Sequence, residues 1–416
     1  MFADRAVGPT ALGNLTGGMA GSGTAEASRP TGRKPPAAFG VLAERFDPDV
    51  IDVRDEPARI RLGIKAGGEW DAVIAGGEMR LEPAAAGLEP DAIVRADAAS
   101  WERIAGDVRG GMDAFRRGRL EVRKNLHLGI GFLAATSGVT GPGRLRFDAV
   151  ETDAGTISTV SAGVGRPVVC LHGLGGTKAS FMPTVRGLAD RYRVIAVDLP
   201  GFGDSDKPIA VPYDAPYFAR TVIALLDALE LDRAHLIGNS MGGRVAIEAG
   251  LTDPERVERM VLLSPALAWL RERRWKRLLP PQLPMLGLLQ PAPRAIAEPI
   301  VRRLIPGSDN GWSAAGVDEF LRAFLTPRGR AAFYSALRNI YVDEPHGEEG
   351  LWTRLAALSP DSMFVWGRQD PLVPIGFMNH VERTLPAARH VELDCGHVPQ
   401  VERPRETNAA IRDFLG

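Results

Sequence analysis

The sequence predicts an α/β protein with a doubly wound, mostly parallel sheet and a helical cap, preceded by a small α+β domain. From residue 145 onward, short apolar runs alternate with helical stretches, which is typical of a parallel sheet with helices on both faces. Residues 40–135 instead contain runs such as "ARIRLGIKAG", which alternate apolar and polar residues as half-buried antiparallel strands do. The Gly- and Pro-rich stretch "TSGVTGPGR" (136–144) between them predicts an interdomain linker.

These breaks define the expected organisation of the chain. Residues 1–38 are rich in Gly, Ala, Ser, Thr and Pro, which predicts a disordered tail because such a segment buries too little apolar surface to fold. We expect a first domain at 39–140, which includes the linker, and a second domain at 141–416. An insertion at about 266–350, between the predicted strands "VERMVLLSP" and "SMFVWGRQD", predicts the cap.

Composition narrows the class of protein. The chain has 416 residues, is 45% hydrophobic and 24% charged, and carries a net charge of −1, so we expect no nucleic-acid partner. No apolar run approaches the roughly 18 residues that span a bilayer, and the first residues lack the basic and apolar regions of a signal peptide. Two cysteines in the whole chain predict a reducing compartment, so a cytoplasmic protein is expected. The sequence does not indicate an oligomeric state.

Within the first domain, "AIVRADAASWERIAGDV" predicts a strand followed by a helix with Trp101, Ile104 and Val108 on one face. This stretch, together with "GGMDAF" (110–115), "GRLEV" (118–122) and an apolar final helix, resembles the sterol-carrier-protein lipid-binding family over residues 40–135. The resemblance implies a sheet covered by helices that encloses an apolar tunnel for a fatty acyl chain or sterol. The family's long opening helix is short or missing here. The alternative is a structural or dimerising domain with a filled core.

In the second domain, "HLIGNSMGGRVAIE" (235–248) predicts a strand, a sharp turn and a helix, with Ser240 in a G-x-S-x-G nucleophile elbow. Asp370 and His397 each follow another predicted strand, in "VWGRQDPLVP" and "LDCGHVPQVERP". The carboxyl ends of parallel strands meet at one edge of a sheet, so the three side chains are expected to lie together. A serine needs a base to take its proton, and a carboxylate orients the imidazole that serves as that base. The sequence therefore predicts a Ser240–His397–Asp370 catalytic triad.

The order Ser…Asp…His and these motifs resemble the α/β-hydrolase family over residues 145–416. "CLHGLGGTKASF" (170–181) resembles the family's oxyanion-hole loop, which implies that the backbone N–H groups of Leu174 and Met241 face the developing oxyanion. His172 in that loop is interpreted as architectural. "DLPGFGDSDKP" (198–208) resembles the next family loop, where Asp204 and Asp206 are interpreted as turn-forming residues. The resemblance implies no cofactor and no metal.

A serine at the elbow excludes the haloalkane dehalogenases and epoxide hydrolases, which resemble this scaffold but carry an aspartate there. We expect a serine hydrolase of esterase or lipase type that cleaves carboxylic esters of apolar or lipid substrates through an acyl-enzyme. Carbon–carbon bond hydrolases of aromatic or sterol ring-cleavage products are the alternative, although their histidine is typically followed by tryptophan and this chain has Val398. A non-enzymatic lipid sensor or carrier with a silent hydrolase pocket is a further alternative.

The cap contains two amphipathic stretches and a basic run. Apolar residues recur at helical spacing within 317–325 and again within 333–341, so each stretch predicts a helix with one buried face. The stretch "WLRERRWKRLLPPQLPMLGLLQ" is basic and then apolar. One interpretation is a folded cap with a solvated arginine face. The other is a lid that contacts anionic membrane lipid, as a peripheral membrane protein does, through Arg271, Arg273, Arg274, Lys276 and Arg277.

Overall fold

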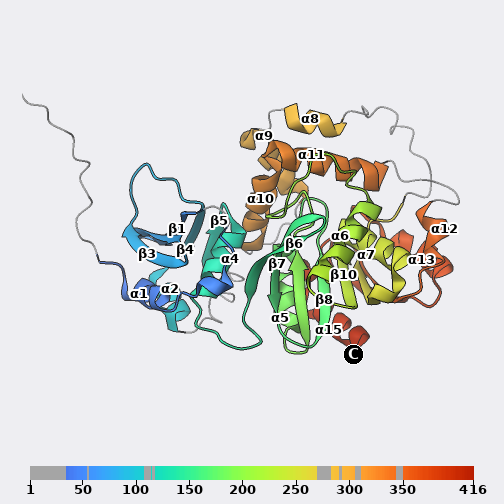
Figure 1. Ribbon diagram of the computed structural model, residues 1–416, viewed down its shortest axis with the longest axis horizontal. Helices are drawn as coiled ribbons and strands as arrows, with labels where there is room; N and C mark the ends of the chain where they lie inside the picture. Colours follow the sequence, from blue (N-terminus) through green and yellow to red (C-terminus); the bar gives the residue numbers. More distant parts are fainter. Residues whose placement is uncertain are drawn as a thin grey trace, which may run out of the picture. The chain divides into compact units, whose positions relative to one another are not determined.

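Two β-sheets organise the part of the chain that the computed structural model describes (Figure 1). The described residues are 34–53, 56–106, 114, 118–268, 283–289, 293–304, 311–342 and 350–416. Most of the predicted tail and the whole basic run of the cap (Arg271–Arg277) lie outside these residues. The expectations of a disordered tail and of membrane contact through that run therefore stay predictions.

The first sheet has five strands in the order β3-β2-β1-β4-β5. Strand β1 pairs antiparallel with β2 and parallel with β4, and the β2–β3 and β4–β5 pairs are antiparallel. The mixed sheet packs with helices into an apolar core, as an α+β domain requires. Its elements are helix α1 (Ala37–Glu44), strands β1 (Ala58–Ile64), β2 (Glu69–Ala75), β3 (Glu78–Pro83) and β4 (Ala92–Ala96), helix α2 (Ala98–Gly106), strand β5 (Leu120–Arg123) and helix α4 (Leu126–Ala135).

Helix α2 has the predicted amphipathic face. Trp101 and Ile104 are buried, whereas Val108 lies outside the described residues. The Trp101 ring packs edge-on against Phe39 of α1 at a centroid distance of 4.9 Å, and its Nε1–H donates to the Gly63 carbonyl at 2.9 Å. Trp101 thus ties both helices to the sheet. The sterol-carrier resemblance of this domain stays a prediction.

The second sheet has eight strands in the order β13-β12-β11-β10-β8-β9-β7-β6. The six strands from β13 to β9 are parallel, while β7 and β6 are antiparallel to their neighbours. The strands are β6 (Arg146–Thr152), β7 (Gly155–Ala162), β8 (Arg166–Leu171), β9 (Tyr192–Val197), β10 (Ala234–Asn239), β11 (Val257–Leu263), β12 (Asp361–Gly367) and β13 (Arg389–Leu393). This is the doubly wound, mostly parallel sheet that the alternating pattern predicts.

Helices cover both faces of the parallel part of this sheet. Successive side chains of a strand point to opposite faces, so one strand contributes to the apolar cluster on each side. Val169 and Leu171 of β8 belong to the apolar cluster with α6 and α7, and Val168 and Cys170 to the cluster with α5 and α15. Cys170 lies on β8, four strands away from β13, and Cys395 lies just beyond the end of β13. Both are buried free thiols. The helices are α5 (Met182–Leu188), α6 (Ala215–Ala228), α7 (Met241–Thr252), α13 (Met378–Thr384), α14 (Pro399–Glu402) and α15 (Pro404–Leu415).

Helices inserted between β11 and β12 form the cap, which lies at the top of Figure 1. Its predicted amphipathic helix is present: Val317 and Leu321 are buried, and Phe320, Phe324 and Leu325 pack against them. The cap helices are α8 (Leu283–Leu289), α9 (Arg294–Leu304), α10 (Gly311–Phe324) and α11 (Pro327–Ala336), with a π-helical continuation at Leu337–Val342. The short helix α12 (Leu351–Leu355) follows the cap and lies at the right of Figure 1. Of the helices in the described part of the chain, none has both the length and the apolar character needed to cross a bilayer.

The role of Trp101 leads to a stability prediction. Trp101→Ala removes a fully buried ring and its hydrogen bond, so it is expected to lower the free energy of unfolding of the first domain by about 3–5 kcal/mol. Glu102→Ala, at an exposed position one residue further, is the control and should change this quantity by less than about 0.5 kcal/mol. Urea denaturation followed by circular dichroism measures both. Equal midpoints for the two variants would contradict the proposed tie.

Candidate active site

Ser240 stands in a strained turn between strand β10 and helix α7. Its backbone has φ 52° and ψ −115°, a left-handed conformation that a non-glycine residue keeps only when its surroundings enforce it. The flanking glycines allow the turn to pack tightly. A Cβ at Gly238 would lie 2.2 Å from the Gly242 carbonyl oxygen, and one at Gly242 would lie 2.0 Å from the Leu171 oxygen of β8. Only glycine therefore fits on either side of the serine.

Asp370 and His397 follow β12 and β13, and the structure brings them into contact. His397 Nδ1 lies 2.7 Å from Asp370 Oδ2 and donates to it, since a carboxylate only accepts. The other carboxylate oxygen of Asp370 accepts from the backbone N–H groups of Leu372 and Val373, at 2.8 and 2.9 Å. Burial opposes the charge of Asp370, but these hydrogen bonds, that of His397 foremost, hold the pKa of its carboxyl below the usual value. The imidazole is thereby oriented with Nε2 free to accept a proton.

Two side chains that the sequence analysis did not single out hold the histidine loop. Asn239, which directly precedes Ser240, donates from Nδ2 to the carbonyl oxygens of His397 and Leu263, both at 3.0 Å. Glu402 accepts from the N–H groups of Gly396 and Val398, at 2.7 and 2.9 Å, and so holds the backbone on both sides of His397. Both residues lie inside the quoted motifs, but nothing in a local pattern indicates a contact with a loop about 160 residues away, as Asn239 makes.

The predicted oxyanion loop lies beside the serine. A Cβ at Gly173 would be 3.2 Å from Ser240 Cβ, which places the start of the loop against the elbow. His172 is architectural in this structure: its Nε2 accepts from the Leu199 N–H at 3.0 Å, so Nδ1 carries the hydrogen and donates to the Gly173 carbonyl at 2.7 Å. Burial lowers the pKa of His172 and keeps this tautomer neutral. Leu174 packs against the apolar cluster that contains Met241.

A residue that follows cap helix α11 contacts both Ser240 and the backbone of Met241. The phenol oxygen of Tyr341, on the π-helical turn, lies 3.2 Å from Ser240 Oγ and also accepts from the backbone N–H of Met241. Met241 is one of the two predicted oxyanion donors. Burial raises the pKa of Tyr341 to about 12, so the phenol is neutral at working pH. Tyr341 ends the amphipathic stretch predicted within 333–341, but a local pattern does not indicate this contact, because it joins residues 101 positions apart.

The two aspartates of the 198–208 loop do not join this constellation. Asp206 accepts from the Thr156 N–H at 2.9 Å and its own N–H donates back to the Thr156 carbonyl, so it is a turn residue as expected. Asp204 is buried among cations on the side that faces the first domain. Within the described residues, no group of three His, Cys, Asp or Glu side chains is arranged to hold a metal ion.

Comparison with known proteins places this geometry in a family. The sequence signature of the alpha/beta hydrolase fold matches residues 166–404. A pimeloyl-[acyl-carrier protein] methyl ester esterase of Aeromonas hydrophila is 31% identical over 265 residues, which cover 63% of this chain and 100% of that protein. A 2-hydroxy-6-oxo-6-phenylhexa-2,4-dienoate hydrolase of Comamonas testosteroni is 30% identical over 277 residues, which cover 61% of this chain and 89% of that protein.

A solved structure gives the same fold. A membrane phospholipase A described as a bacterial virulence factor is 27% identical, with a TM-score of 0.52 over 65% of this chain and 86% of that chain. The family match begins at Arg166, so the first domain lies outside it. From the signature, which spans more than half of the chain, and from the doubly wound sheet that carries the elbow, we conclude that this protein belongs to the α/β-hydrolase family.

Proposed function

We propose that the protein is a serine hydrolase that cleaves carboxylic esters of apolar substrates, with Ser240 as the nucleophile, His397 as the base and Asp370 as the residue that orients it. The His397–Asp370 hydrogen bond of 2.7 Å, on the loops beside the serine elbow, is the observation that supports this most strongly. The likeness to a methyl ester esterase and to a phospholipase is consistent with acyl transfer.

In the proposed mechanism Ser240 Oγ, which lies 3.2 Å from the Tyr341 hydroxyl in this structure, exchanges that contact for a hydrogen bond to His397 Nε2. His397 Nε2 takes the proton of Ser240 as Oγ attacks the ester carbonyl, and Asp370 stabilises the imidazolium that results. The backbone N–H groups of Leu174 and Met241 would stabilise the oxyanion, and loss of one such donor typically costs about 3 kcal/mol of transition-state stabilisation. His397 then protonates the leaving alcohol, and a water molecule hydrolyses the acyl-enzyme by the same route.

An apolar substrate is supported by the side chains that cover the site. A Cβ at Gly175 of the oxyanion loop would lie 2.2 Å from the Phe320 ring and 3.2 Å from Phe333, so cap aromatics rest directly on this loop. Phe320, Phe324, Phe333 and Tyr334 form one aromatic cluster with ring centroids 5.3–6.0 Å apart. Such a wall favours an apolar acyl or alcohol group over a charged one.

Carbon–carbon bond cleavage is the second candidate, because relatives of about 30% identity include a 2-hydroxy-6-oxo-6-phenylhexa-2,4-dienoate hydrolase and a 2-hydroxymuconate semialdehyde hydrolase. The same three residue types serve both chemistries. Val398, which follows the histidine, favours the ester proposal.

The triad proposal predicts the effect of three substitutions. Ser240→Ala, His397→Ala and Asp370→Asn are each expected to lower kcat for a p-nitrophenyl ester by about 10⁴-fold while the circular dichroism spectrum is unchanged. A double variant should be scarcely worse than Ser240→Ala alone, because the three groups act as a unit. A fluorophosphonate should label Ser240, as peptide mapping can show.

Ser264→Ala is a matched control, since Ser264 also has a left-handed backbone (φ 43°) directly after a strand, β11. This variant should still be labelled. Full activity of Ser240→Ala would overturn the proposal.

The two candidate reactions differ in substrate ranking. We expect kcat/KM for a simple apolar ester to exceed that for a vinylogous 1,5-diketone, because the chain lacks the tryptophan that typically follows the histidine in the carbon–carbon hydrolases. Steady-state kinetics with both substrates and one enzyme preparation measures the ratio. The reverse ranking would favour carbon–carbon hydrolysis.

The Tyr341 contact predicts a gain of reactivity on removal of the hydroxyl. The phenol oxygen of Tyr341 contacts both Ser240 and the Met241 N–H. A substrate carbonyl can therefore reach Ser240 only after the phenol has moved away. Tyr341→Phe loses these hydrogen bonds, worth about 1 kcal/mol net, so the rate constant of fluorophosphonate labelling should rise by about fivefold. Tyr334→Phe, in the aromatic cluster of the same cap, is the control and should not change it. Slower labelling of Tyr341→Phe would instead mean that the phenol assists the reaction.

A further inference from the structure

The turn between β5 and α4 of the first domain contacts cap helix α10. We call residues Arg123–His127 the cap seat. Asp318 of α10, which is 4% exposed, accepts from Arg123 Nε at 2.5 Å and from Arg123 Nη2 at 3.3 Å. It also accepts from the backbone N–H of Lys124 at 3.2 Å. Side chain and backbone of the seat therefore hold the same carboxylate, which is also paired with Arg294 of the cap.

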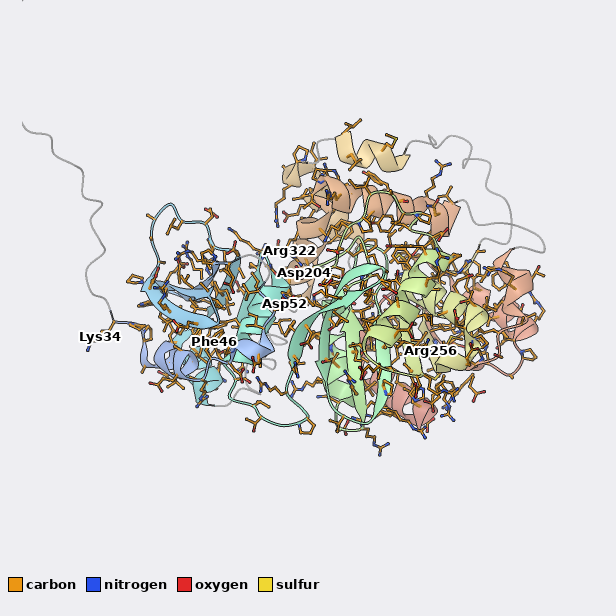
Figure 2. All side chains as sticks on the ribbon, in the orientation of Figure 1. Lys34, Phe46, Asp52, Asp204, Arg256 and Arg322 are labelled. Carbon is orange, nitrogen blue, oxygen red and sulfur yellow. The ribbon has the colours of Figure 1, made fainter. Side chains whose placement is uncertain are left out.

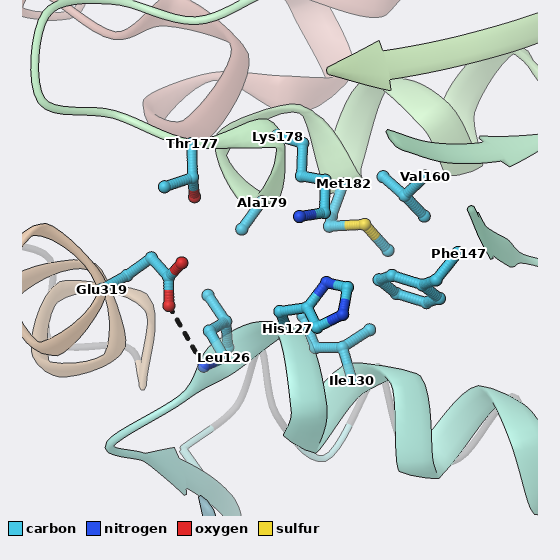
Figure 3. A pocket seen from close by; sticks show the side chains of 10 residues that line it. All are labelled: Leu126, His127, Ile130, Phe147, Val160, Thr177, Lys178, Ala179, Met182 and Glu319. Atoms are coloured by element: carbon cyan, nitrogen blue, oxygen red, sulfur yellow. Dashed lines mark hydrogen bonds between the residues drawn. The ribbon is translucent and has the colours of Figure 1, made fainter. Parts of the chain in front are cut away.

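A second carboxylate of α10 caps the N-terminus of helix α4, which begins within the cap seat. Glu319 Oε2 accepts from the Leu126 N–H at 3.2 Å (Figure 3), at the N-terminal end of α4 where free N–H groups and the helix dipole favour a negative charge. Asn125 caps the same end through Leu128 N–H at 3.0 Å. Lys124 has a left-handed backbone (φ 67°), a conformation that costs free energy in a non-glycine residue. The turn is thus built to present N–H groups to α10.

From α10 the contacts continue to the oxyanion loop. Arg322 donates to Glu319 at 2.6 Å and, through two nitrogens, to Asp204 at 2.7 and 3.0 Å; Figure 2 labels Arg322 and Asp204. Asp204 accepts from Lys178 Nζ at 3.2 Å, and Asp198 accepts from both Lys178 Nζ and Lys178 N–H, at 2.5 and 2.7 Å. Lys178 directly follows Leu174–Thr177. The backbone of the oxyanion loop is therefore fixed at its end by this network.

Several charges of the network are buried, among them Lys178, Asp198, Asp318 and Glu319. Asp204 is held ionised: burial opposes its charge, but Arg322 and Lys178, which both donate hydrogen bonds to it, keep its pKa well below the usual value. Burial likewise opposes the charge of Lys178, and Asp198 and Asp204 raise its pKa above the usual value. Loss of one partner leaves a buried charge uncompensated, which is more disruptive than loss of an exposed pair. The carboxylates of the network are Asp198, Asp204, Asp318 and Glu319, together with Glu298 beside Arg294, and its cations are Arg123, Lys178, Arg294 and Arg322.

Apolar packing joins the same two parts of the chain. One apolar cluster extends from Trp101 and Phe132 of the first domain through Phe147 and Val160 to Val185 of α5. Between α4 and η2 (Lys178–Phe181) lies a small cavity of about 10 Å³, lined by Leu126, His127, Ile130 and Phe147 among others (Figure 3). A space of this size holds about one water molecule at most, so side chains fill the boundary almost completely. The boundary is a packed interface within one compact unit, Pro35–Gly416.

We infer that the first domain positions the cap and the oxyanion loop, with Arg123 as the positioning residue that connects the cap seat to Asp318. The inference rests on the proposed function in so far as the oxyanion loop serves acyl transfer. It differs from the delivery of lipid by a sterol-carrier-like domain in a measurable way. A domain that holds the cap affects every substrate, whereas a domain that delivers lipid affects only long, poorly soluble ones.

The experiment uses full-length protein with Arg123→Ala, Asp318→Asn and the double variant. Each single variant is expected to lower kcat/KM by about fivefold or more, equally for a short soluble ester and a long-chain ester. The double variant should be scarcely worse than Asp318→Asn alone, since that substitution already removes the charge that Arg123 contacts, along with the ion pair to Arg294. Amide hydrogen exchange should become faster in two separate segments, 311–324 of α10 and 172–178 of the oxyanion loop, and the second segment does not contact Arg123 through any of the hydrogen bonds above.

Arg95→Ala is the matched control, because Arg95 pairs with Glu69 on the same domain at 2.8 Å and is 45% exposed there. It should leave kinetics and exchange unchanged. Arg123→Lys keeps the positive charge but cannot make the bidentate contact, so it should lower kcat/KM by less than Arg123→Ala does. This variant provides the test if Arg123→Ala does not fold. Amide hydrogen exchange can be measured without ester turnover. A wild-type protein without esterase activity would therefore count against the proposed function, while the exchange rates would still test this inference.

Three results would overturn the inference. Unchanged exchange at 172–178 in Arg123→Ala and Asp318→Asn would mean that the seat does not reach the oxyanion loop. A loss confined to the long-chain ester would indicate substrate delivery. Unchanged kinetics for both esters in correctly folded variants would mean that the first domain does not act on the site at all.

Discussion

The left-handed backbone at Ser240 is the constraint on which the site depends. A residue with φ 52° between a buried strand and a helix is maintained only by close packing, and here the elbow lies so near β8 that a Cβ at Gly242 would meet the Leu171 carbonyl at 2.0 Å. That proximity sets the serine against Gly173 of the oxyanion loop, and Asn239 of the same turn fixes the backbone of His397. The proposed nucleophile, the proposed base and the predicted oxyanion loop are therefore all in contact with one turn.

The cap covers the residues that the sheet brings together. Helices α10 and α11 cover the predicted oxyanion loop with aromatic rings. Tyr341 adds a hydroxyl that contacts both Ser240 Oγ and the backbone N–H of Met241. The phenol oxygen satisfies the buried N–H of Met241, which an apolar side chain could not do.

The buried ion network explains how the first domain contributes to the structure of the cap. Asp318 and Glu319 lie on a cap helix, where two unpaired buried carboxylates would be strongly unfavourable. Their partners come in part from the turn after β5, which presents Arg123 and two backbone N–H groups. Such networks contribute less to net stability than to a single defined arrangement of the parts they join, because desolvation offsets most of the attraction. The arrangement defined here includes Lys178, at the end of the oxyanion loop.

The sequence by itself determined the doubly wound sheet, the elbow at Ser240 and the strand-end positions of Asp370 and His397, because these follow from local periodicity and from the rule that parallel strand ends share one edge. It also determined the amphipathic face of α10. Only the tertiary structure decided the contacts that depend on long loop closures: Tyr341 on Ser240, Asn239 on His397, and Arg123 on Asp318, 195 positions apart. A hydrophobic pattern records which face of a helix is buried but not which polar group it meets, since burial is non-directional and hydrogen bonds are directional. For that reason Asp204 could be interpreted from sequence only as a turn residue, although it lies at the centre of the charges that join the two domains.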